Sequence, residues 1–544
     1  MALRFIAFAT IGASVSAATR DRSRVVLAAP AAPSRNRDST GACRHDLPNY
    51  PLDEVRAHLS AKKGGHVWVT YKCGVYDVTE FIEQHPGGVK RIMLAAGGDI
   101  ERFWKQFTLH DDDGVRDILE RHRIGNVKDY KAPAADANGA ASAEAQWAKE
   151  PERSPALVPL SKRPFNAETP EGVLDEYFTP NDMFFVRNHM PVPVIENPEG
   201  PNSTFCLQIE GEGIIPHCFP IGELKSMFPH RTVVNTIQCG GNRRSEMAAA
   251  YSEQGGAVKG LNWSNGGIGT ASWTGVPIRD VINACRAPVT PSIKAGQRHI
   301  LFEGADKDPA GNFNVSVPWE TAMDQYGDAI VAFEMNGEPI PRDHGYPLRA
   351  IVPGTVGVRN CKWLQRIRVQ PSESQSVWQQ HDYKNFPPWQ AKPDPSLPSV
   401  YAMPVQSSVT DASYDPGADA LVAKGYAYAG GGNGIQRVDV SFDGGKTFEA
   451  TASILPVPAG AMEKVTPKTM RDTWSWRQIL LQHPTEEIRA KPQPCSEGGD
   501  GGASCYNVCF KATTDDQATQ PSVAQYNFRG LLYNGYSCRE VKVE

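Results

Sequence analysis

The stretch that decides the fold of this chain is residues 236–247, which read Thr-Ile-Gln-Cys-Gly-Gly-Asn-Arg-Arg-Ser-Glu-Met. An apolar, strand-like run over 232–237 leads to Cys239 in a glycine turn, and two arginines follow shortly after. A thiolate is a soft ligand for a transition metal, and nearby guanidinium groups favour the ionised sulfur. The glycines allow close approach of a bulky ligand, and the arginines can bind an oxyanion or phosphate. This pattern predicts a metal and anion site, although an isolated Cys-Gly-Gly more often marks a buried structural cysteine beside surface arginines.

Composition describes an ordinary globular protein, since 40% of the 544 residues are hydrophobic and 22% are charged. At roughly 150 residues per domain, this length predicts three or four domains. The formal net charge of -5, with no basic domain, argues against nucleic-acid binding. No apolar run reaches the roughly 20 residues that a membrane-spanning helix needs. The 11 cysteines are scattered without a Cys-x-x-Cys pair, so we expect neither a disulfide framework nor a zinc site.

Residues 1–43 have the composition of a targeting presequence. They contain six arginines, only two acidic residues, and many alanines and serines. An apolar run over 5–13 and the small residues at 15–18 leave a secretory signal as the alternative. Because the arginines continue well beyond Ala18, we expect a mitochondrial presequence that is absent from the mature fold.

Residues 44–129 have the pattern of a compact α+β unit with two loop histidines. Alternating runs at 67–71 and 74–78 predict a hairpin, and three helical segments follow it. His85 stands in a His-Pro-Gly-Gly sequence, and His110 lies between two of the expected helices. Two such histidines suit a planar iron porphyrin held from both faces, although either one alone is more often a surface or helix-capping residue.

The His-Pro-Gly-Gly motif, together with Ala-Ala-Gly-Gly-Asp at 95–99, makes the whole of this unit resemble cytochrome b5. The resemblance implies that His85 and His110 are the axial ligands of a haem b. Because two histidines leave no open position on the iron, this haem would carry electrons rather than bind oxygen.

Residues 130–158 are rich in alanine, proline and small polar residues, which predicts a flexible linker. As a coil, this segment has a root-mean-square span of roughly 30 Å. We therefore expect the haem unit to dock on a partner domain and to move away from it.

Residues 159–385 resemble the molybdopterin domain of the sulfite oxidase and plant nitrate reductase family. The resemblance rests on residues 236–247, on Asn-Asp-Met-Phe-Phe-Val-Arg-Asn-His at 181–189, and on polar loops between 302 and 364. It implies a mixed α+β fold that holds a molybdenum pterin cofactor through the Cys239 sulfur. The implied cofactor-binding residues are Phe185, Val186, Arg187, Asn188, His189, Cys239, Asp306, His344, Arg349, Asn360, Cys361 and Lys362.

Loops that bring many donors together suit a pterin with a phosphate tail, although each of these polar side chains alone is more often a solvated surface group. Cys361 departs from the residue that relatives carry beside the lysine, and we do not interpret it as a second metal ligand.

The resemblance also implies catalytic residues and a substrate pocket. The implied catalytic residues are Cys239, Arg187, Tyr383 and Arg244, and the pocket adds Trp263 and Arg471. The arginines would neutralise an anionic substrate, which is otherwise costly to desolvate. Tyr383 would position the substrate and relay protons.

From residue 386 to 544 the chain reads as short alternating strands punctuated by proline, serine and glycine. Residues 436–442 alternate with period two, and Asp-Gly-Gly then turns the chain into 446–448 as a hairpin. Strands at this spacing predict a β-sandwich. The segment, including Asn-Phe-Arg-Gly at 527–530, resembles the immunoglobulin-like dimerisation domain of the same family, which implies a homodimer.

The order of the domains favours one activity within the family. A cytochrome b5 unit in front of the molybdenum domain resembles animal-type sulfite oxidases, whereas plant-type nitrate reductases carry the haem later and continue into a flavin unit. No nucleotide-binding glycine fingerprint is present. The resemblance implies a multidomain α+β enzyme of the mitochondrial intermembrane space, which oxidises sulfite to sulfate and passes single electrons through haem to cytochrome c. A nitrate or other oxyanion reductase, and a non-enzymatic b5-type electron carrier, are the alternatives.

Overall fold

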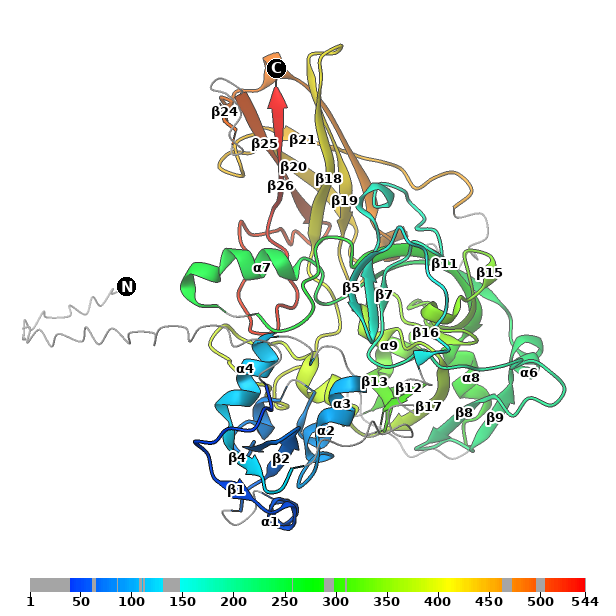
Figure 1. Cartoon of the computed structure of the whole chain (residues 1–544). Coiled ribbons are helices and arrows are strands. Elements are labelled where there is room, and N and C mark those ends of the chain that lie inside the picture. The colour runs from blue at the N-terminus through cyan, green and yellow to red at the C-terminus, as the bar shows by residue number, and fades with distance from the viewer. Residues whose placement is uncertain are drawn as a thin grey trace, which may run out of the picture.

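The computed structural model describes residues 40–60, 65–85, 87–106, 110, 113–130, 147–256, 258–287, 298–308, 311–461, 472–495 and 504–543. Figure 1 shows a small N-terminal domain in blue beside a larger central domain, with a C-terminal β-sandwich at the top of the view. In the parts of the chain so described, no helix is long and apolar enough to cross a membrane.

The N-terminal domain is a four-stranded sheet with helices packed around it. The sheet has the order β1-β4-β3-β2, formed by β1 (Asn49–Tyr50), β2 (Trp68–Tyr71), β3 (Gly74–Asp77) and β4 (Arg123–Val127). The helices are α1 (Leu52–Ala57), the 3₁₀ turn η3 (Ile82–Gln84), α2 (Val89–Met93), α3 (Glu101–Gln106) and α4 (Asp113–Arg121). Because β2 and β3 pair antiparallel, the predicted hairpin is confirmed, and so are the three helical segments after it.

Two predicted boundaries move in the structure. Thr40 is buried and the Gly41 amide donates to Glu120 Oε1 (3.1 Å). Residues 40–43 therefore belong to the N-terminal domain and are not part of the predicted presequence. The rest of the predicted presequence lies outside the described residues. At the second boundary Trp147 is buried, and Arg153 pairs with Asp343 (Nε–Oδ2 2.7 Å), so residues 147–158 belong to the central domain and not to the linker.

The central domain is built from three sheets with short helices between them. The sheet orders are β10-β11-β14-β15 with β16 on β14, then β13-β12-β17-β8-β9, and a small β5-β6-β7 sheet. The strands are β5 (Val158–Lys162), β6 (Phe165–Glu168), β7 (Val186–Arg187), β8 (Cys206–Gly211), β9 (His217–Pro220), β10 (Arg231–Gln238), β11 (Ile268–Pro277), β12 (His299–Asp308), β13 (Gly311–Pro318), β14 (Ile330–Met335), β15 (Glu338–Pro339), β16 (Arg349–Ile351) and β17 (Leu364–Gln370). The helical elements are η5 (Glu171–Val173), α6 (Ile221–Met227), α7 (Arg244–Ala250), η6 (Ser252–Gln254), α8 (Ile278–Ala284), α9 (Trp319–Met323), η7 (Arg342–His344), η8 (Gly357–Arg359) and the π-helix η9 (Trp378–Asp382).

Packing in the central domain follows the periodicity of its elements. Helix α8 buries Ile278, Val281 and Ile282, which share one face at helical spacing, against the core. Strand β10 is buried on both faces from Val233 onwards because β11 pairs along its whole length and the C-terminal sandwich covers its end. The strand therefore ends in the interior, and it places the residue that follows it there too.

The C-terminal domain is a sandwich of two sheets, as predicted. One sheet has the order β18-β19-β23-β22, and the other has the order β21-β20-β25-β24 with β26 on β25. The strands are β18 (Gln406–Asp415), β19 (Ala420–Tyr428), β20 (Ile435–Ser441), β21 (Ala450–Thr451), β22 (Ser453–Ile454), β23 (Arg477–Pro484), β24 (Gln493–Pro494), β25 (Ser504–Thr514) and β26 (Ser537–Val543), with 3₁₀ turns η11 (Asp472–Trp474) and η12 (Thr485–Glu487).

One predicted strand in this domain is wrong. The return strand of the hairpin is β21 at 450–451, not 446–448. The Asp443 carboxylate accepts the backbone amides of Lys446 (3.0 Å) and Thr447 (2.9 Å), so these amides close a wide turn instead of pairing with β20.

The expectation of no disulfide framework is also wrong. Eight cysteines form four disulfides, which are Cys43–Cys73, Cys206–Cys218, Cys495–Cys505 and Cys509–Cys538. Cys509 and Cys538, for example, lie directly opposite each other in the β25–β26 register. Strand register brings such partners together, and the spacing of cysteines along the sequence does not reveal it. Cys239, Cys285 and Cys361 are free and buried.

Candidate functional site

Cys239 lies at the end of β10, where the strand gives way to a tight turn. Its amide donates to Gly267 O (2.8 Å), and the Gly241 amide points back at the sulfur (Gly241 N–Cys239 Sγ 3.4 Å). On the other side of the turn, the Leu532 amide donates to Gly240 O (2.8 Å). The thiol is therefore held by backbone contacts from both the central and the C-terminal domain.

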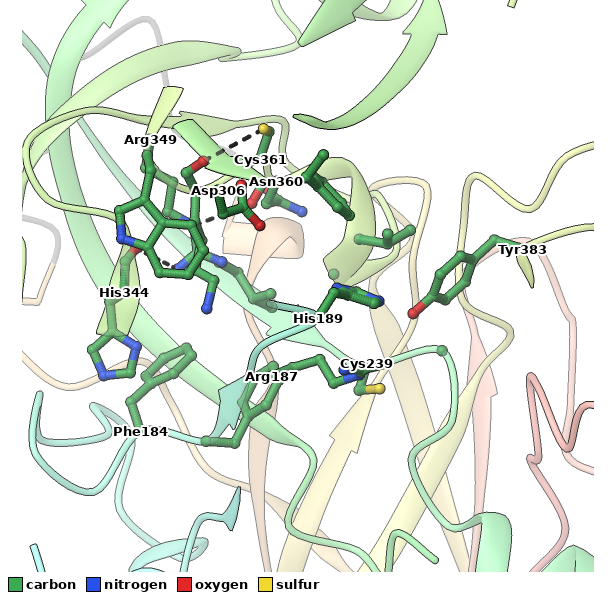
Figure 2. Close-up of a pocket in the computed structure, with 18 residues that line it drawn as sticks. Phe184, Arg187, His189, Cys239, Asp306, His344, Arg349, Asn360, Cys361 and Tyr383 are labelled. Carbon is green, nitrogen blue, oxygen red and sulfur yellow. Dashed lines mark hydrogen bonds between the residues drawn. The ribbon is translucent and has the colours of Figure 1, made fainter. Parts of the chain in front are cut away.

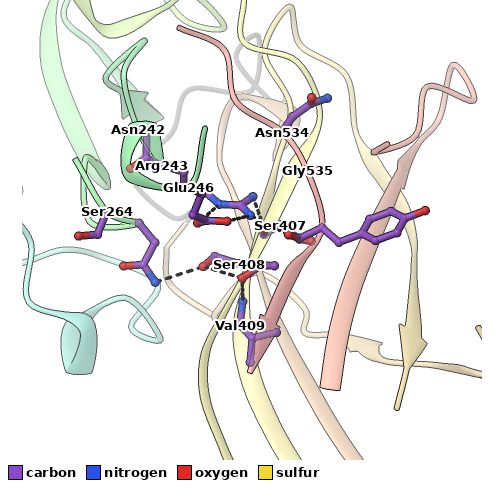
Figure 3. A network of polar contacts seen from close by, with 12 residues as sticks. Asn242, Arg243, Glu246, Ser264, Ser407, Ser408, Val409, Asn534 and Gly535 are labelled. Atoms are coloured by element: carbon purple, nitrogen blue, oxygen red, sulfur yellow. Dashed lines mark hydrogen bonds and ion pairs between the residues drawn. The ribbon is translucent and has the colours of Figure 1, made fainter. Parts of the chain in front are cut away.

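Arg243 braces this turn rather than binding an anion. The residue adopts a left-handed backbone conformation (φ 61°) just before α7 begins, and its side chain is fully buried. Its guanidinium donates to Glu246 (2.6 Å), Ser407 O (3.0 Å) and Tyr536 O (3.0 Å), as Figure 3 shows. Because two of these acceptors are carbonyls of the sandwich, the C-terminal domain helps to set the position of the cysteine.

A pocket opens above Cys239, and it gathers most of the predicted cofactor residues (Figure 2). The predicted residues that line it are Phe185, Arg187, His189, Cys239, Asp306, His344, Arg349, Asn360, Cys361, Lys362 and Tyr383. The lining residues that sequence reasoning missed are Phe184, Ile237, Gly240, Phe313, Gly357, Val358 and Trp363. Phe184, Ile237 and Gly240 lie within the stretches 181–189 and 236–247 that carry the family resemblance, although they were not singled out there. The other missed residues are apolar or glycine, so their side chains carry no polar signal in the sequence.

Four predicted site residues do not line the pocket. Val186 packs in a small cluster beside β6, and Trp263 meets the ring of Phe185 edge to face (6.2 Å between centroids). Asn188 lies behind the pocket wall, where its side-chain oxygen accepts from Lys362 Nζ. Arg244 donates to Arg529 O (3.0 Å) and Leu261 O (2.7 Å).

Arg471 lies outside the described residues. For Arg244, the structure shows a cation whose hydrogen bonds go to backbone carbonyls, and burial lowers its pKa to about 10. Its predicted catalytic role stays a prediction.

The upper part of the pocket holds polar groups that burial has perturbed. Burial lowers the pKa of Lys362 to about 7, with Arg349 adding repulsion, and burial raises the pKa of Asp306 to about 7. Burial also lowers the pKa of Arg349 to about 9 and that of His344 to about 4. Such shifts cluster where a protein is arranged to receive a polar ligand.

Two atoms of the pocket wall support a polar cofactor directly. Asp306 Oδ1 and His189 Nε2 are buried and have no hydrogen-bond partner among the described residues. Buried polar atoms without partners are rare in folded proteins, so a ligand with hydrogen-bonding groups fits this wall. The thiol of Cys239, on the same pocket, fits a transition metal carried by that ligand.

The lower part of the pocket combines the thiol with groups suited to an anion. Figure 2 places Arg187 beside Cys239 and directs the Tyr383 hydroxyl towards the same space. Arg187 Nη1 donates to Asn188 O (2.6 Å) and Asn166 Oδ1 (3.2 Å), which fixes its guanidinium. Burial raises the pKa of Tyr383, so its hydroxyl keeps its proton at neutral pH.

Arg529 is a further cation near this region that sequence reasoning missed. It pairs with Asp382 (Nη2–Oδ1 2.9 Å), the residue before Tyr383, and its Nε has no partner among the described residues. Its charge opposes the burial effect on the pKa of Tyr383. Arg529 stands in Asn-Phe-Arg-Gly at 527–530, a run that resembles the dimerisation domain and therefore does not mark a residue of the pocket region.

The two histidines predicted to bind haem face each other in the N-terminal domain. The ring centroids of His85 and His110 are 6.2 Å apart, and the two ring planes are almost parallel (7° between planes). Two metal–nitrogen bonds of about 2 Å each, plus the half-widths of two imidazole rings, add up to about 6 Å. His85 Nδ1 lies 3.3 Å from Gly88 O, which leaves Nε2 as the ligand atom. The pair therefore fits one iron between them.

Three family matches cover most of the chain. Residues 51–128 match the cytochrome b5-like heme/steroid binding domain, residues 189–378 match the oxidoreductase molybdopterin binding domain, and residues 396–544 match the Mo-co oxidoreductase dimerisation domain. Fold and site thus define a molybdenum oxidoreductase with molybdopterin and haem as cofactors. The predicted fold class and cofactors are confirmed, and the alternative of a non-enzymatic electron carrier is excluded.

Relatives with similar sequences identify the family of molybdenum oxidoreductases to which the chain belongs. The chain is 40% identical to the sulfite oxidase of Gallus gallus, over 89% of this chain and 98% of that protein. It is 39% identical to the mitochondrial sulfite oxidase of Homo sapiens (90% and 83% covered) and 29% identical to nitrate reductase [NADH] 1 of Phaseolus vulgaris (79% and 45% covered). The chain belongs to the sulfite oxidase family. The sulfane dehydrogenase SoxCD of Paracoccus pantotrophus shares the fold (TM-score 0.51, 23% identity, 76% of this chain and 93% of that chain covered).

Proposed function

We propose that this protein oxidises sulfite to sulfate at the pocket around Cys239 and passes the electrons singly to a haem held by His85 and His110. The observation that carries the proposal is the composition of that pocket, where one buried thiol stands beside Arg187 and Tyr383. Two relatives that this chain matches over 98% and 83% of their length are named sulfite oxidases.

When it is bound through the Cys239 sulfur, the molybdenum pterin cofactor supplies oxygen-transfer chemistry and the capacity to take up two electrons. Asp306, His344, Arg349, Asn360 and Lys362 would hold its polar groups along the upper wall. The shifted pKa values of this wall allow Asp306 and Lys362 to adapt their charge to the bound ligand.

The lower wall would bind the substrate. The Arg187 guanidinium, which Asn166 and Asn188 hold in place, would present its positive charge to sulfite in a partly buried site. Hydrogen bonds between charged groups are strong in such a place because the effective dielectric is low. The neutral Tyr383 hydroxyl would donate a hydrogen bond to the anion, and Arg529, paired with Asp382 beside it, would add positive charge.

Further assignments follow from the relatives. We propose cytochrome c as the electron acceptor, a homodimer formed through the C-terminal domain, and the mitochondrial intermembrane space as the location. Relatives from Homo sapiens and Drosophila melanogaster are named mitochondrial. Four disulfides suit an oxidising compartment, which supports the intermembrane space but suits the secretory alternative too. Imaging of the tagged full-length chain against mitochondrial and secretory markers separates the two.

The proposed activity is tested by mixing the holoenzyme anaerobically with sulfite and following the haem absorbance. We expect full reduction of the haem by sulfite, and no reduction in protein produced without molybdate. Dithionite, which reduces haem directly, checks that both preparations carry a competent haem. Holoenzyme containing both metals whose haem sulfite does not reduce would contradict the proposal, and oxidation of the reduced haem by nitrate would point to the oxyanion-reductase alternative.

A further inference from the structure

The N-terminal domain rests on the central domain through Arg91 of α2. The Arg91 guanidinium forms an ion pair with Asp308 at the end of β12 and lies 4.8 Å over the centre of the Trp378 ring. It also donates to Gly87 O (3.1 Å), within the loop that carries His85. One side chain thus joins the haem-ligand loop to the central domain.

The haem-ligand loop itself touches the central domain beside this ion pair. A methyl group added to Gly88 would come within 2.5 Å of Val377 Cγ2 and 3.9 Å of His381 Nδ1. Gly88 O also contacts the His85 ring through Nδ1 (3.3 Å). The loop therefore packs closely on residues 377–381 at the point where it holds the histidine.

The same segment of the central domain reaches the pocket. The π-helix η9 begins at Trp378 and ends one residue before Tyr383, which lines the pocket. The Trp378 ring packs on Phe313 (4.7 Å between centroids) and on His189 (6.0 Å), and both of these side chains belong to the pocket wall. A continuous series of ring contacts thus runs from the pocket wall to Arg91.

The ion pair is largely removed from water. The Asp308 side chain is 1% exposed and the Arg91 side chain is 20% exposed. Removal of one member of a desolvated ion pair is destabilising, because the remaining charge loses the group that was paired with it. The pair therefore favours the docked arrangement.

We propose that Arg91 is a positioning residue for electron transfer between the domains. Through Asp308 and Trp378 it holds the haem domain where the rings of Trp378, Phe313 and His189 bridge the pocket and the haem-ligand loop. The inference rests on the proposed function. Oxidation of one sulfite releases two electrons, and each passage along this route reduces one ferric haem to ferrous haem. The external one-electron carrier must reoxidise the haem before the second electron follows.

The experiment reverses the charges of the pair in the holoenzyme. In anaerobic stopped flow with sulfite, we expect Arg91→Glu to slow haem reduction about tenfold or more, and Arg91→Glu combined with Asp308→Arg to recover most of the rate. Arg56→Glu is the matched control, since Arg56 is an exposed residue of α1 that pairs with Asp53, three residues away in the same helix. The haem spectrum of each variant verifies that the iron site is intact.

A second readout does not depend on turnover. Small-angle scattering of the same proteins should show a larger radius of gyration for Arg91→Glu than for the wild type, and a return towards the wild-type value in the reversed pair. Asp308→Asn leaves the haem domain unaltered and should also increase the radius of gyration. It replaces Arg91→Glu as the test variant if Arg91→Glu loses haem.

The outcomes are distinct. Wild-type rates and scattering in both Arg91→Glu and Asp308→Asn would overturn the docking role of Arg91. If sulfite does not reduce the haem of the wild type, the proposed function fails, while the scattering comparison still reports whether Arg91 docks the domains.

Discussion

The haem site and the molybdopterin pocket are built in opposite ways. His85 and His110 belong to one small domain, where His85 stands in the His-Pro-Gly-Gly motif between η3 and α2, and His110 lies between α3 and α4. The pocket draws side chains from Phe184 to Tyr383, and Arg529 of the C-terminal domain approaches it. A site built from loops of one small domain can therefore be located from short sequence motifs. A site built where strands of several sheets end cannot, because it depends on how those sheets assemble.

The largest expected effect is a loss of sulfite turnover on substitution of Cys239, which should leave the haem site unaffected. Cys239→Ser should lower sulfite turnover by about 1000-fold or more, because a serine hydroxyl is a poor substitute for a soft thiolate ligand. The haem spectrum should not change. Steady-state sulfite oxidation measures the loss, and Cys285→Ser, at a buried free cysteine that does not line the pocket, is the matched control. Normal turnover in Cys239→Ser would show that this sulfur does not ligate the metal.

The reciprocal change acts at His110. His110→Ala should remove one iron ligand and lower cytochrome c reduction by about 100-fold or more, since electrons then lack their route out of the pocket. Sulfite oxidation with a small oxidant that accepts electrons at the pocket should stay within about twofold of the wild type. Parallel assays with the two acceptors check this. Equal loss with both acceptors would mean that the two sites are not separable.

A smaller effect tests the cation that joins the pocket from the C-terminal domain. Arg529→Gln should raise the KM for sulfite about tenfold, because one charge near the anion is removed. Initial rates across sulfite concentrations measure it. Arg437→Gln provides the comparison, because Arg437 is an exposed residue of β20 that pairs with Asp439. An unchanged KM would confine Arg529 to its structural pairing with Asp382.

The smallest effect concerns stability rather than turnover. Burial lowers the pKa of His344 to about 4, below the unfolded value of about 6.5, so the unfolded chain takes up the proton more readily. The contribution of neutral His344 to the free energy of unfolding is therefore present above about pH 6.5 and is lost as the pH falls towards 4. Between pH 7 and pH 5 the free energy of unfolding should fall by about 2 kcal/mol. Thermal unfolding of wild type and His344→Gln across this range measures it. Equal pH dependence in both proteins would contradict a neutral buried His344.

The sequence predicted the parts of the molecule that short motifs mark. The hairpin at β2–β3, the strand leading to Cys239 and the sandwich were placed correctly, because each depends on a local pattern. The structure also brings His85 and His110 face to face, while their role as haem ligands stays a prediction. Most polar residues of the pocket were found only through resemblance to a family, since separate loops supply them. Patterns alone did not bring them together.

What the sequence did not reveal depends on tertiary register. The Cys509–Cys538 disulfide exists because β25 and β26 align these residues opposite each other, and spacing does not encode that alignment. Arg243 reads as an anion-binding residue, yet the fold directs its guanidinium to Glu246 and to carbonyls of the sandwich. Arg91 carried no motif, and its role emerges only when two domains are seen together.

The most direct test of the account is the metal content of the purified wild-type protein produced with ample molybdate. A chain that binds molybdenum through Cys239 and a haem between His85 and His110 should contain one molybdenum and one iron per chain. Protein that contains its full iron but no molybdenum would contradict the central claim.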